Sequence, residues 1–67
     1  MTAAALILHF LAHVHEARVE RIEQFMATRP LSYSHGTTRN ALVVLVKAGE
    51  IERVRVGRYR IAPSETR

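Results

Sequence analysis

The sequence contains no cysteine and no tryptophan, and only four of its 67 residues are phenylalanine or tyrosine. The absence of cysteine excludes disulfide frameworks, cysteine-ligated zinc sites and thiol catalysis. The scarcity of aromatic residues argues against modules that bind single-stranded nucleic acid by stacking bases on aromatic side chains. The longest apolar run, Ala3 to Ala12, contains His9 and is too short to span a membrane. We therefore expect no membrane partner, no signal peptide and a cytoplasmic location.

The sequence also lacks the residue constellations of an enzyme. No acid stands at a recognisable spacing from the serine and histidine residues, and there is no glycine-rich phosphate-binding loop. His9 and His13 have the four-residue spacing of a helical metal pair, but no cysteine or convergent acid accompanies them. A solvent-facing pair is the plainer interpretation, and a pH-sensitive interface of the first helix is a third one. We expect no enzymatic activity, metal, cofactor or small-molecule ligand.

Basic charge is what the sequence does contain, and it is concentrated in the second half. Ten Lys and Arg residues stand against six acidic residues, which gives a net charge of +4. Residues 29–60 hold seven of those ten basic residues and two of the six acidic ones. A small basic domain suggests a polyanionic partner. The length allows one thin core, so we expect one domain over residues 1–62 and a disordered tail over residues 63–67.

Apolar periodicity predicts a first helix over residues 3–15 and a second over residues 20–27. Thr2 is the expected N-cap of the first helix, and Pro30 ends the second because proline disfavours helical backbone in the residue before it. Residues 17–19 are expected to form a short extended link. The inward positions of the two helices are Ala3, Ile7, Phe10, Leu11 and Val14, then Ile22, Phe25 and Met26.

A third helix is predicted from Ser34, whose side chain caps the Thr37 backbone N–H, to about Ala48. Gly49 supplies the left-handed position that follows a helix. The expected inward stripe is Thr38, Ala41, Leu42 and Leu45.

The first and third helices have more apolar surface than one buried stripe requires. Leu6, Leu8 and Ala12 widen the first helix, and Val43, Val44 and Val46 make the third apolar nearly all round. Such surfaces indicate a second apolar contact, inside the domain or with another copy of the chain. We therefore expect a homodimer through the first helix, the third helix or both.

Residues 51–62 alternate apolar and basic side chains, which predicts a β-hairpin. Gly57 and Arg58 fit a two-residue type II′ turn, which requires glycine first. That register pairs Val56 with Tyr59, Arg55 with Arg60, and Val54 with Ile61. It places those four apolar residues on the core face and Arg53, Arg55 and Arg60 on the opposite face, with Arg58 at the tip.

This arginine face carries a functional argument. Like charges directly opposite on one sheet face are destabilising, so Arg55 opposite Arg60 is unfavourable in an isolated domain. A phosphate backbone would neutralise the set, and arginine also suits a narrow minor groove. A merely solvated face is the alternative interpretation.

The order of helix, link, helix, turn, helix and basic hairpin resembles the winged helix-turn-helix domains of small prokaryotic and phage transcription regulators. The resemblance covers residues 5–62. The segment between Met26 and Ser34 is longer than the tight turn of the family and includes Pro30. The residues that carry the resemblance are Tyr33-Ser34-His35-Gly36-Thr37-Thr38-Arg39-Asn40-Ala41-Leu42, then Leu45 and Ala48-Gly49-Glu50-Ile51, then Val54-Arg55-Val56-Gly57-Arg58-Tyr59-Arg60-Ile61.

The resemblance implies a mainly α fold of three helices with a C-terminal hairpin wing, and a sequence-specific regulator that binds double-stranded DNA. The third helix would enter the major groove, where the residues near its start reach the base edges. Arg39 suits guanine and Asn40 suits adenine, whereas Thr37 and His35 suit bases or phosphates. Ser34 is better explained as a structural N-cap than as a residue that contacts bases. Lys47 is also explained by its place at the negative, C-terminal end of the helix dipole. The predicted DNA-binding residues are Ser34, His35, Thr37, Arg39, Asn40, Lys47, Arg53, Arg55, Arg58 and Arg60.

Two other functions remain open from the sequence. Residues 49–51 and 54–58 also look like excisionase-type winged domains, which implies a recombination or architectural DNA-binding role. The apolar segment 43–46 favours a different class, a winged-helix module that docks on a protein through its third helix.

Overall fold

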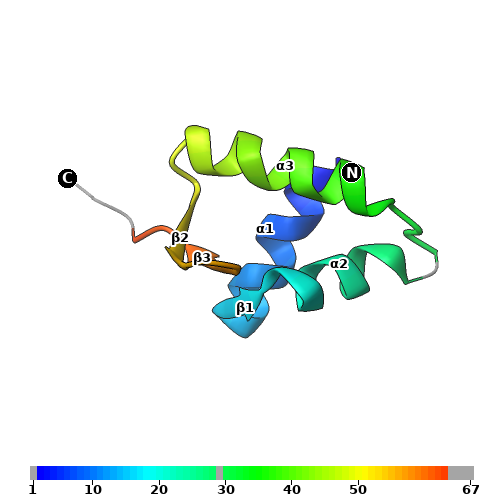
Figure 1. Cartoon of the computed structure of the whole chain (residues 1–67), viewed down its shortest axis with the longest axis horizontal. Helices are drawn as coiled ribbons and strands as arrows, with labels where there is room; N and C mark the ends of the chain where they lie inside the picture. Colours follow the sequence, from blue (N-terminus) through cyan, green and yellow to red (C-terminus); the bar gives the residue numbers. More distant parts are fainter. Residues whose placement is uncertain (1, 29, 64–67) are drawn as a thin grey trace.

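The chain forms three helices and three short strands in the computed structural model, which describes residues 2–28 and 30–63 (Figure 1). The elements follow in the order α1 (Ala3–Val14), β1 (Glu16–Arg18), α2 (Val19–Ala27), α3 (His35–Lys47), β2 (Ile51–Arg55) and β3 (Arg58–Ile61). The strands make one antiparallel sheet in the order β1-β3-β2. This arrangement confirms the predicted mainly α class with a C-terminal hairpin and is compatible with a winged-helix layout.

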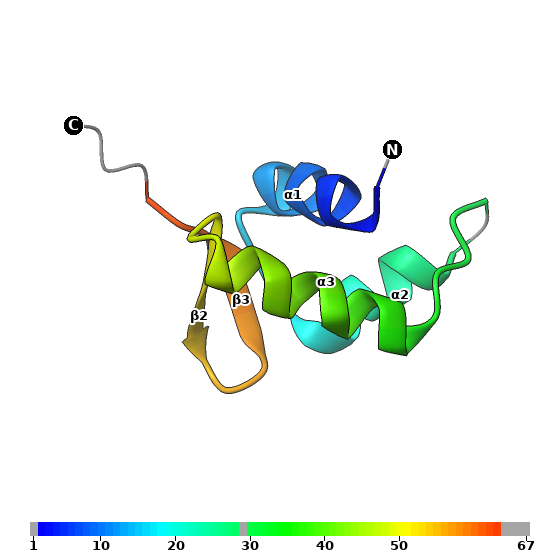
Figure 2. The same ribbon diagram turned by 90° about the horizontal axis from the view of Figure 1, so that it is seen from above.

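The core lies where the three helices meet the inner face of the sheet. Figure 1 shows α2 and α3 in front of α1, with the sheet at one end, and Figure 2 shows α1 beside α3. Phe10 of α1 stacks on Phe25 of α2 with ring centroids 4.4 Å apart. The predicted inward stripes are confirmed by the buried apolar residues Ile7, Phe10, Leu11, Ile22, Met26, Leu42 and Leu45, to which the fold adds Ala17 and Ile51.

Local hydrogen bonds set the helix boundaries. The Thr2 hydroxyl accepts from the Ala5 N–H at 3.1 Å, which confirms the predicted N-cap of α1. At the end of α3, the Gly49 N–H donates to the Val46 carbonyl and the next N–H donates to the Leu45 carbonyl, both at 3.0 Å. This double closure is the Schellman motif, and it needs the positive φ of +77° that Gly49 adopts.

The connection from α2 to α3, which is longer than the tight turn of the winged helix-turn-helix family, contains a hydrogen-bonded turn. Helix α2 ends at Ala27, before Pro30, as predicted. The Tyr33 N–H donates to the Met26 carbonyl at 2.7 Å, and Ser32 adopts a positive φ of +50°. The turn therefore ends directly before Ser34, the N-cap of α3.

The hairpin differs from the predicted one in its turn. The two turn residues are Val56 and Gly57, because Arg55 pairs with Arg58. Gly57 has a φ of +75°, and Val56 does not have positive φ, whereas a type II′ turn requires positive φ at its first position. The expected Gly57-Arg58 turn is therefore wrong, and Val56 is 92% exposed at the tip instead of facing the core.

The register of the hairpin differs as well, and this changes the charge pattern. The ladder is irregular between Arg53 and Arg55, so Val54 is an additional residue in β2. The turn lies one residue earlier than predicted, which shifts the register by two positions, and the bulge shifts it by one more. Arg60 therefore pairs with Glu52 rather than with Arg55, and Arg53 pairs with Tyr59.

The expected link at residues 17–19 is extended only in part: Ala17 and Arg18 belong to β1, which adds a third strand to the sheet, whereas Val19 begins α2. Glu16, Ala17 and Arg18 of β1 pair with Arg60, Tyr59 and Arg58 of β3. Among residues 2–28 and 30–63, no helix combines the length and apolarity needed to cross a bilayer. Residues 64–67 lie outside the described residues, so the disordered tail stays a prediction.

Candidate nucleic-acid interface

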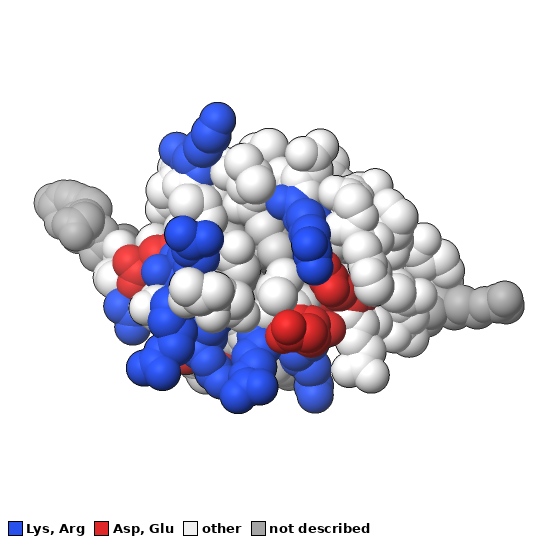
Figure 3. Space-filling view, viewed as in Figure 1, with Lys and Arg blue, Asp and Glu red and all other residues white. Residues whose placement is uncertain are grey.

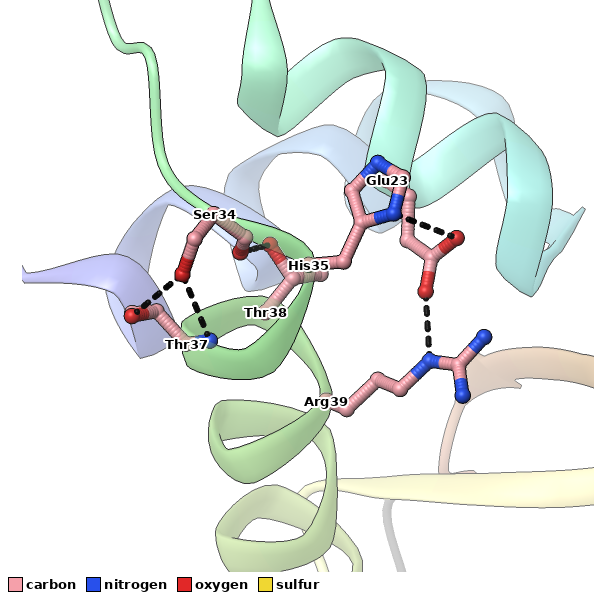
Figure 4. Close-up of polar contacts among 6 residues, drawn as sticks. All are labelled: Glu23, Ser34, His35, Thr37, Thr38 and Arg39. Atoms are coloured by element: carbon pink, nitrogen blue, oxygen red, sulfur yellow. Dashed lines mark hydrogen bonds and ion pairs between the residues drawn. The ribbon is translucent and has the colours of Figure 1, made fainter.

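The first turn of α3 is held by Ser34 (Figure 4). Its Oγ accepts from the Thr37 N–H at 3.1 Å and donates to the Thr37 Oγ1 at 3.0 Å. The Ser34 carbonyl also accepts from the Thr38 hydroxyl at 3.0 Å. These bonds occupy the Ser34 side chain, so the predicted capping role is confirmed. Thr37 stays exposed beside the cap.

Arg39 is held by a buried carboxylate from the neighbouring helix. Its Nε donates to the Glu23 Oε2 at 2.6 Å, and Glu23 retains only 8% of its side-chain exposure while Arg39 retains 67%. The hydrogen bond first, and the negative charge of Glu23 second, raise the pKa of Arg39 above its ordinary value. Like other arginine side chains, this guanidinium is charged at every working pH. Among the described residues, no hydrogen bond involves its two Nη groups.

Glu23 is the site residue that the sequence interpretation missed. The same carboxylate lies near a second predicted residue, because its Oε1 is 3.8 Å from the His35 Nδ1. A sequence signal existed: Glu23 stands four residues after Val19 and three before Met26, on the edge of the apolar stripe of α2. An acid at such a position is buried and needs a partner from another element.

The exposed start of α3 has two edges. His35 and Arg39 are four residues apart and share the edge toward α2, where Glu23 lies. Thr37 and Asn40 are three residues apart and share a second, exposed edge. Two edges of different polar chemistry therefore flank the outward surface of this helix.

The sheet carries the other charged residues in cross-strand rows. At the turn end, Arg18 of β1, Arg58 of β3 and Arg55 of β2 stand side by side. We call this set the arginine row. Its one ion pair among the described residues joins the Arg58 Nη1 to the Glu16 Oε2 at 3.1 Å. Figure 3 shows basic side chains gathered over the strands.

The adjacent outward-facing row is charge-compensated. Arg60 stands between Glu16 and Glu52, and its guanidinium lies 2.5 Å from the Glu52 carboxylate. The expected repulsion between Arg55 and Arg60 is therefore wrong. Opposite charges across the strands account for Arg60 within the fold.

Two further predicted residues line a separate groove. Lys47 of α3 and Arg53 of β2 line a hollow of about 670 Å³ between the helix and the hairpin, together with Val43, Val46 and Tyr59. Arg53 is therefore on the α3 side of the sheet, opposite Tyr59, and is not part of the arginine row.

Most of the additional apolar side chains of α1 pack inside the domain. Leu6 and Leu8 are partly buried and pack against the core, whereas Ala12 is exposed. The surplus of α3 stays on the surface, since Val43 and Val44 are 53% and 58% exposed.

The histidine pair of α1 lies apart from these basic residues. The His9 and His13 rings stack with centroids 6.5 Å apart. Within the part of the chain that the structure describes, no group of three or more His, Cys, Asp or Glu side chains is placed to hold a metal ion.

Comparisons with protein-family models, curated proteins and solved structures find no match to this chain.

Proposed function

We propose that the protein binds double-stranded DNA with sequence specificity and acts as a transcription regulator. Helix α3 enters the major groove, and arginines of the sheet contact the phosphate backbone. The observation that carries the proposal is the Arg39 guanidinium, which is exposed at the start of α3 and is held through Nε by the buried Glu23 carboxylate.

This arrangement suits base recognition. An α-helix fits the major groove, and arginine recognises guanine by donating two hydrogen bonds to O6 and N7. With Nε bound to Glu23, the two Nη groups of Arg39 are available for that fork. Asn40, on the second exposed edge of α3, suits the N6 and N7 of adenine.

Binding to duplex DNA tests the proposal. A salt titration with random duplex is followed by selection of preferred sequences from a random pool. We expect a steep fall of affinity with salt together with an enriched motif, whose symmetry reports the oligomeric state. A steep salt dependence without a motif indicates an architectural or excisionase-like protein, and the absence of binding at low salt contradicts any DNA-binding role.

Arg39→Ala sharpens the test. The variant should lose discrimination at one base position by about 1–3 kcal/mol, because one bidentate contact is removed. Arg55→Ala is the control, since loss of a phosphate contact weakens binding to all sequences alike. Affinities for the selected duplex and for its single-base variants distinguish the two patterns.

A protein partner is the second candidate, favoured by the exposed valines of α3. Val43, Val44 and Val46 are 53%, 58% and 39% exposed. Within a DNA complex, such side chains suit thymine methyl groups. Without DNA, they suit a protein surface or a second copy of the chain. Sedimentation of the free protein tests the homodimer, and a monomer at high concentration, free and on DNA, contradicts it.

A further inference from the structure

The arginine row brings three like charges together from separate parts of the chain. Arg18 pairs with Arg58 across β1 and β3, and Arg58 pairs with Arg55 across β3 and β2. Residues in one cross-strand row emerge on the same face of a sheet. Arg18 lies 37 positions before Arg55 in the sequence, so the pairing of β1 creates the set.

The compensated row of the same sheet provides an internal comparison. Glu16, Arg60 and Glu52 alternate in sign across the same three strands. In the arginine row, Glu16 reaches Arg58 diagonally at 3.1 Å, and no described residue forms an ion pair with Arg18 or Arg55. Like charges directly opposite destabilise a sheet, so this row is unfavourable for folding alone.

A hollow of about 340 Å³ lies against this row. Its lining consists of Arg18, Arg55 and Arg58, the turn residues Val56 and Gly57, and Glu20. Three basic residues and one acidic residue therefore line it. A backbone hydrogen bond joins two sides of this hollow. The Val19 N–H at the start of α2 donates to the carbonyl of Gly57 in the turn at 2.8 Å.

We propose that this hollow binds a phosphate group and that Arg18 is one of its three ligands, with Arg55 and Arg58. Guanidinium groups bind phosphate oxygens through paired charged hydrogen bonds. On DNA the ligand is a backbone phosphodiester, and this part of the inference rests on the proposed function. Arg60 is excluded from the ligand set because it does not line the hollow.

Inorganic phosphate tests the site without DNA. The arginine Nε–Hε resonances are followed by NMR during titration with phosphate and, as a control, with chloride at equal ionic strength. We expect the signals of Arg18, Arg55 and Arg58 to shift, with that of Arg60 unchanged. Arg18→Gln should weaken the response of the other two. Equal shifts of all arginines, or none, would overturn the site.

Duplex DNA provides the second arm. Arg18→Gln should reduce the slope of log affinity against log salt by up to about 0.9, the value for one neutralised phosphate, because Arg55 and Arg58 still contact the same phosphate. Arg60→Gln is the matched control and should leave the slope unchanged. Thermal unfolding of both variants checks that they fold, and Arg18→Lys should retain most of the slope.

The two arms separate failure of the site from failure of the proposed function. Phosphate shifts without duplex binding would keep the site and contradict the proposed function. Duplex binding with the same slope change for Arg18→Gln and Arg60→Gln would keep DNA binding and overturn the three-arginine site.

Discussion

The two cationic regions of the molecule hold their arginines in opposite ways. At the start of α3, Arg39 is bound through Nε to a carboxylate that is almost completely buried. At the turn end of the sheet, Arg18 and Arg55 have no ion pair among the described residues and border an open hollow. The first arrangement restricts the orientation of the Arg39 guanidinium. The second leaves the positive charges of Arg18 and Arg55 available to a ligand.

This difference matches two kinds of DNA contact. Base recognition requires donors at defined angles, so a guanidinium held by a second residue is suited to it. Phosphate contacts depend mainly on charge and tolerate mobile side chains. In the proposed complex, α3 therefore supplies specificity and the sheet supplies affinity. The following variants test this division, from the largest expected effect to the smallest.

The largest effect is expected from Glu23→Ala. Without its carboxylate partner, Arg39 loses its restricted orientation, and discrimination at one base position should fall by up to about 1–3 kcal/mol. Glu23→Gln retains an acceptor oxygen and should preserve more of the discrimination. The salt slope should stay unchanged in both. A uniform loss of affinity for every sequence would contradict the assignment of Glu23 as a positioning residue.

The next largest effect is on folding stability, and it is expected from replacing one glycine in each region: Gly57 in the turn of the sheet and Gly36 at the start of α3. Gly57 has a φ of +75° in the turn, so Gly57→Ala should destabilise the fold by about 1–2 kcal/mol. Gly36 has no positive φ, and a Cβ there would meet only the Ser34 Oγ at 4.0 Å. Gly36→Ala should therefore stabilise the fold by about 0.5–1 kcal/mol.

Urea denaturation measures both glycine variants, and DNA binding separates their functional effects. If the start of α3 approaches DNA closely, Gly36→Ala should weaken binding despite its greater stability. Destabilisation by Gly36→Ala would show that α3 begins in a different conformation.

A smaller effect is expected from Arg18→Glu, which converts a like-charged pair with Arg58 into an opposite-charged pair. The fold should gain about 0.2–1 kcal/mol, while affinity for random duplex should decrease. Thermal unfolding and a binding titration measure the two changes. If stability and affinity fell together, the arginine row would be a structural feature rather than a ligand site.

The smallest effect is expected from Glu20→Gln. Glu20 borders the hollow of the arginine row, and its charge also raises the pKa of Arg39. Removal of this charge should strengthen binding to all sequences at low salt by about 0.5 kcal/mol, roughly twofold. Glu50→Gln changes the net charge equally and lies at the other end of the hairpin, so it is the control. Equal effects of both variants would place the DNA elsewhere.

The elements themselves followed from the sequence. Thr2, Ser34 and Gly49 carry local signals for helix ends, and each acts through hydrogen bonds within five residues. The inward stripes of the helices followed from a period of about 3.6 residues. Arg39 was assigned because it stands at the start of a capped, exposed helix.

The hairpin register and the charge pattern needed the tertiary structure. Two shifts, an earlier turn and a bulge at Val54, moved Arg60 from beside Arg55 to beside Glu52. Both turn positions are compatible with the local alternation, because glycine serves either as the first or as the second turn residue. Packing of Ile51 and Ile61 against the helices distinguishes them.

By itself, then, the sequence determined three helices, the first and third of them with a capping side chain, a basic C-terminal hairpin and a basic residue at the start of the third helix. The tertiary structure decided which charges meet. It placed Glu23 under Arg39, and it brought Arg18 beside Arg58 through a strand predicted only as a link. The physical reason is the distance along the sequence over which each interaction acts. Helix caps and apolar periodicity depend on residues a few positions apart, whereas the partner of a charged side chain depends on how separate helices and strands pack and pair.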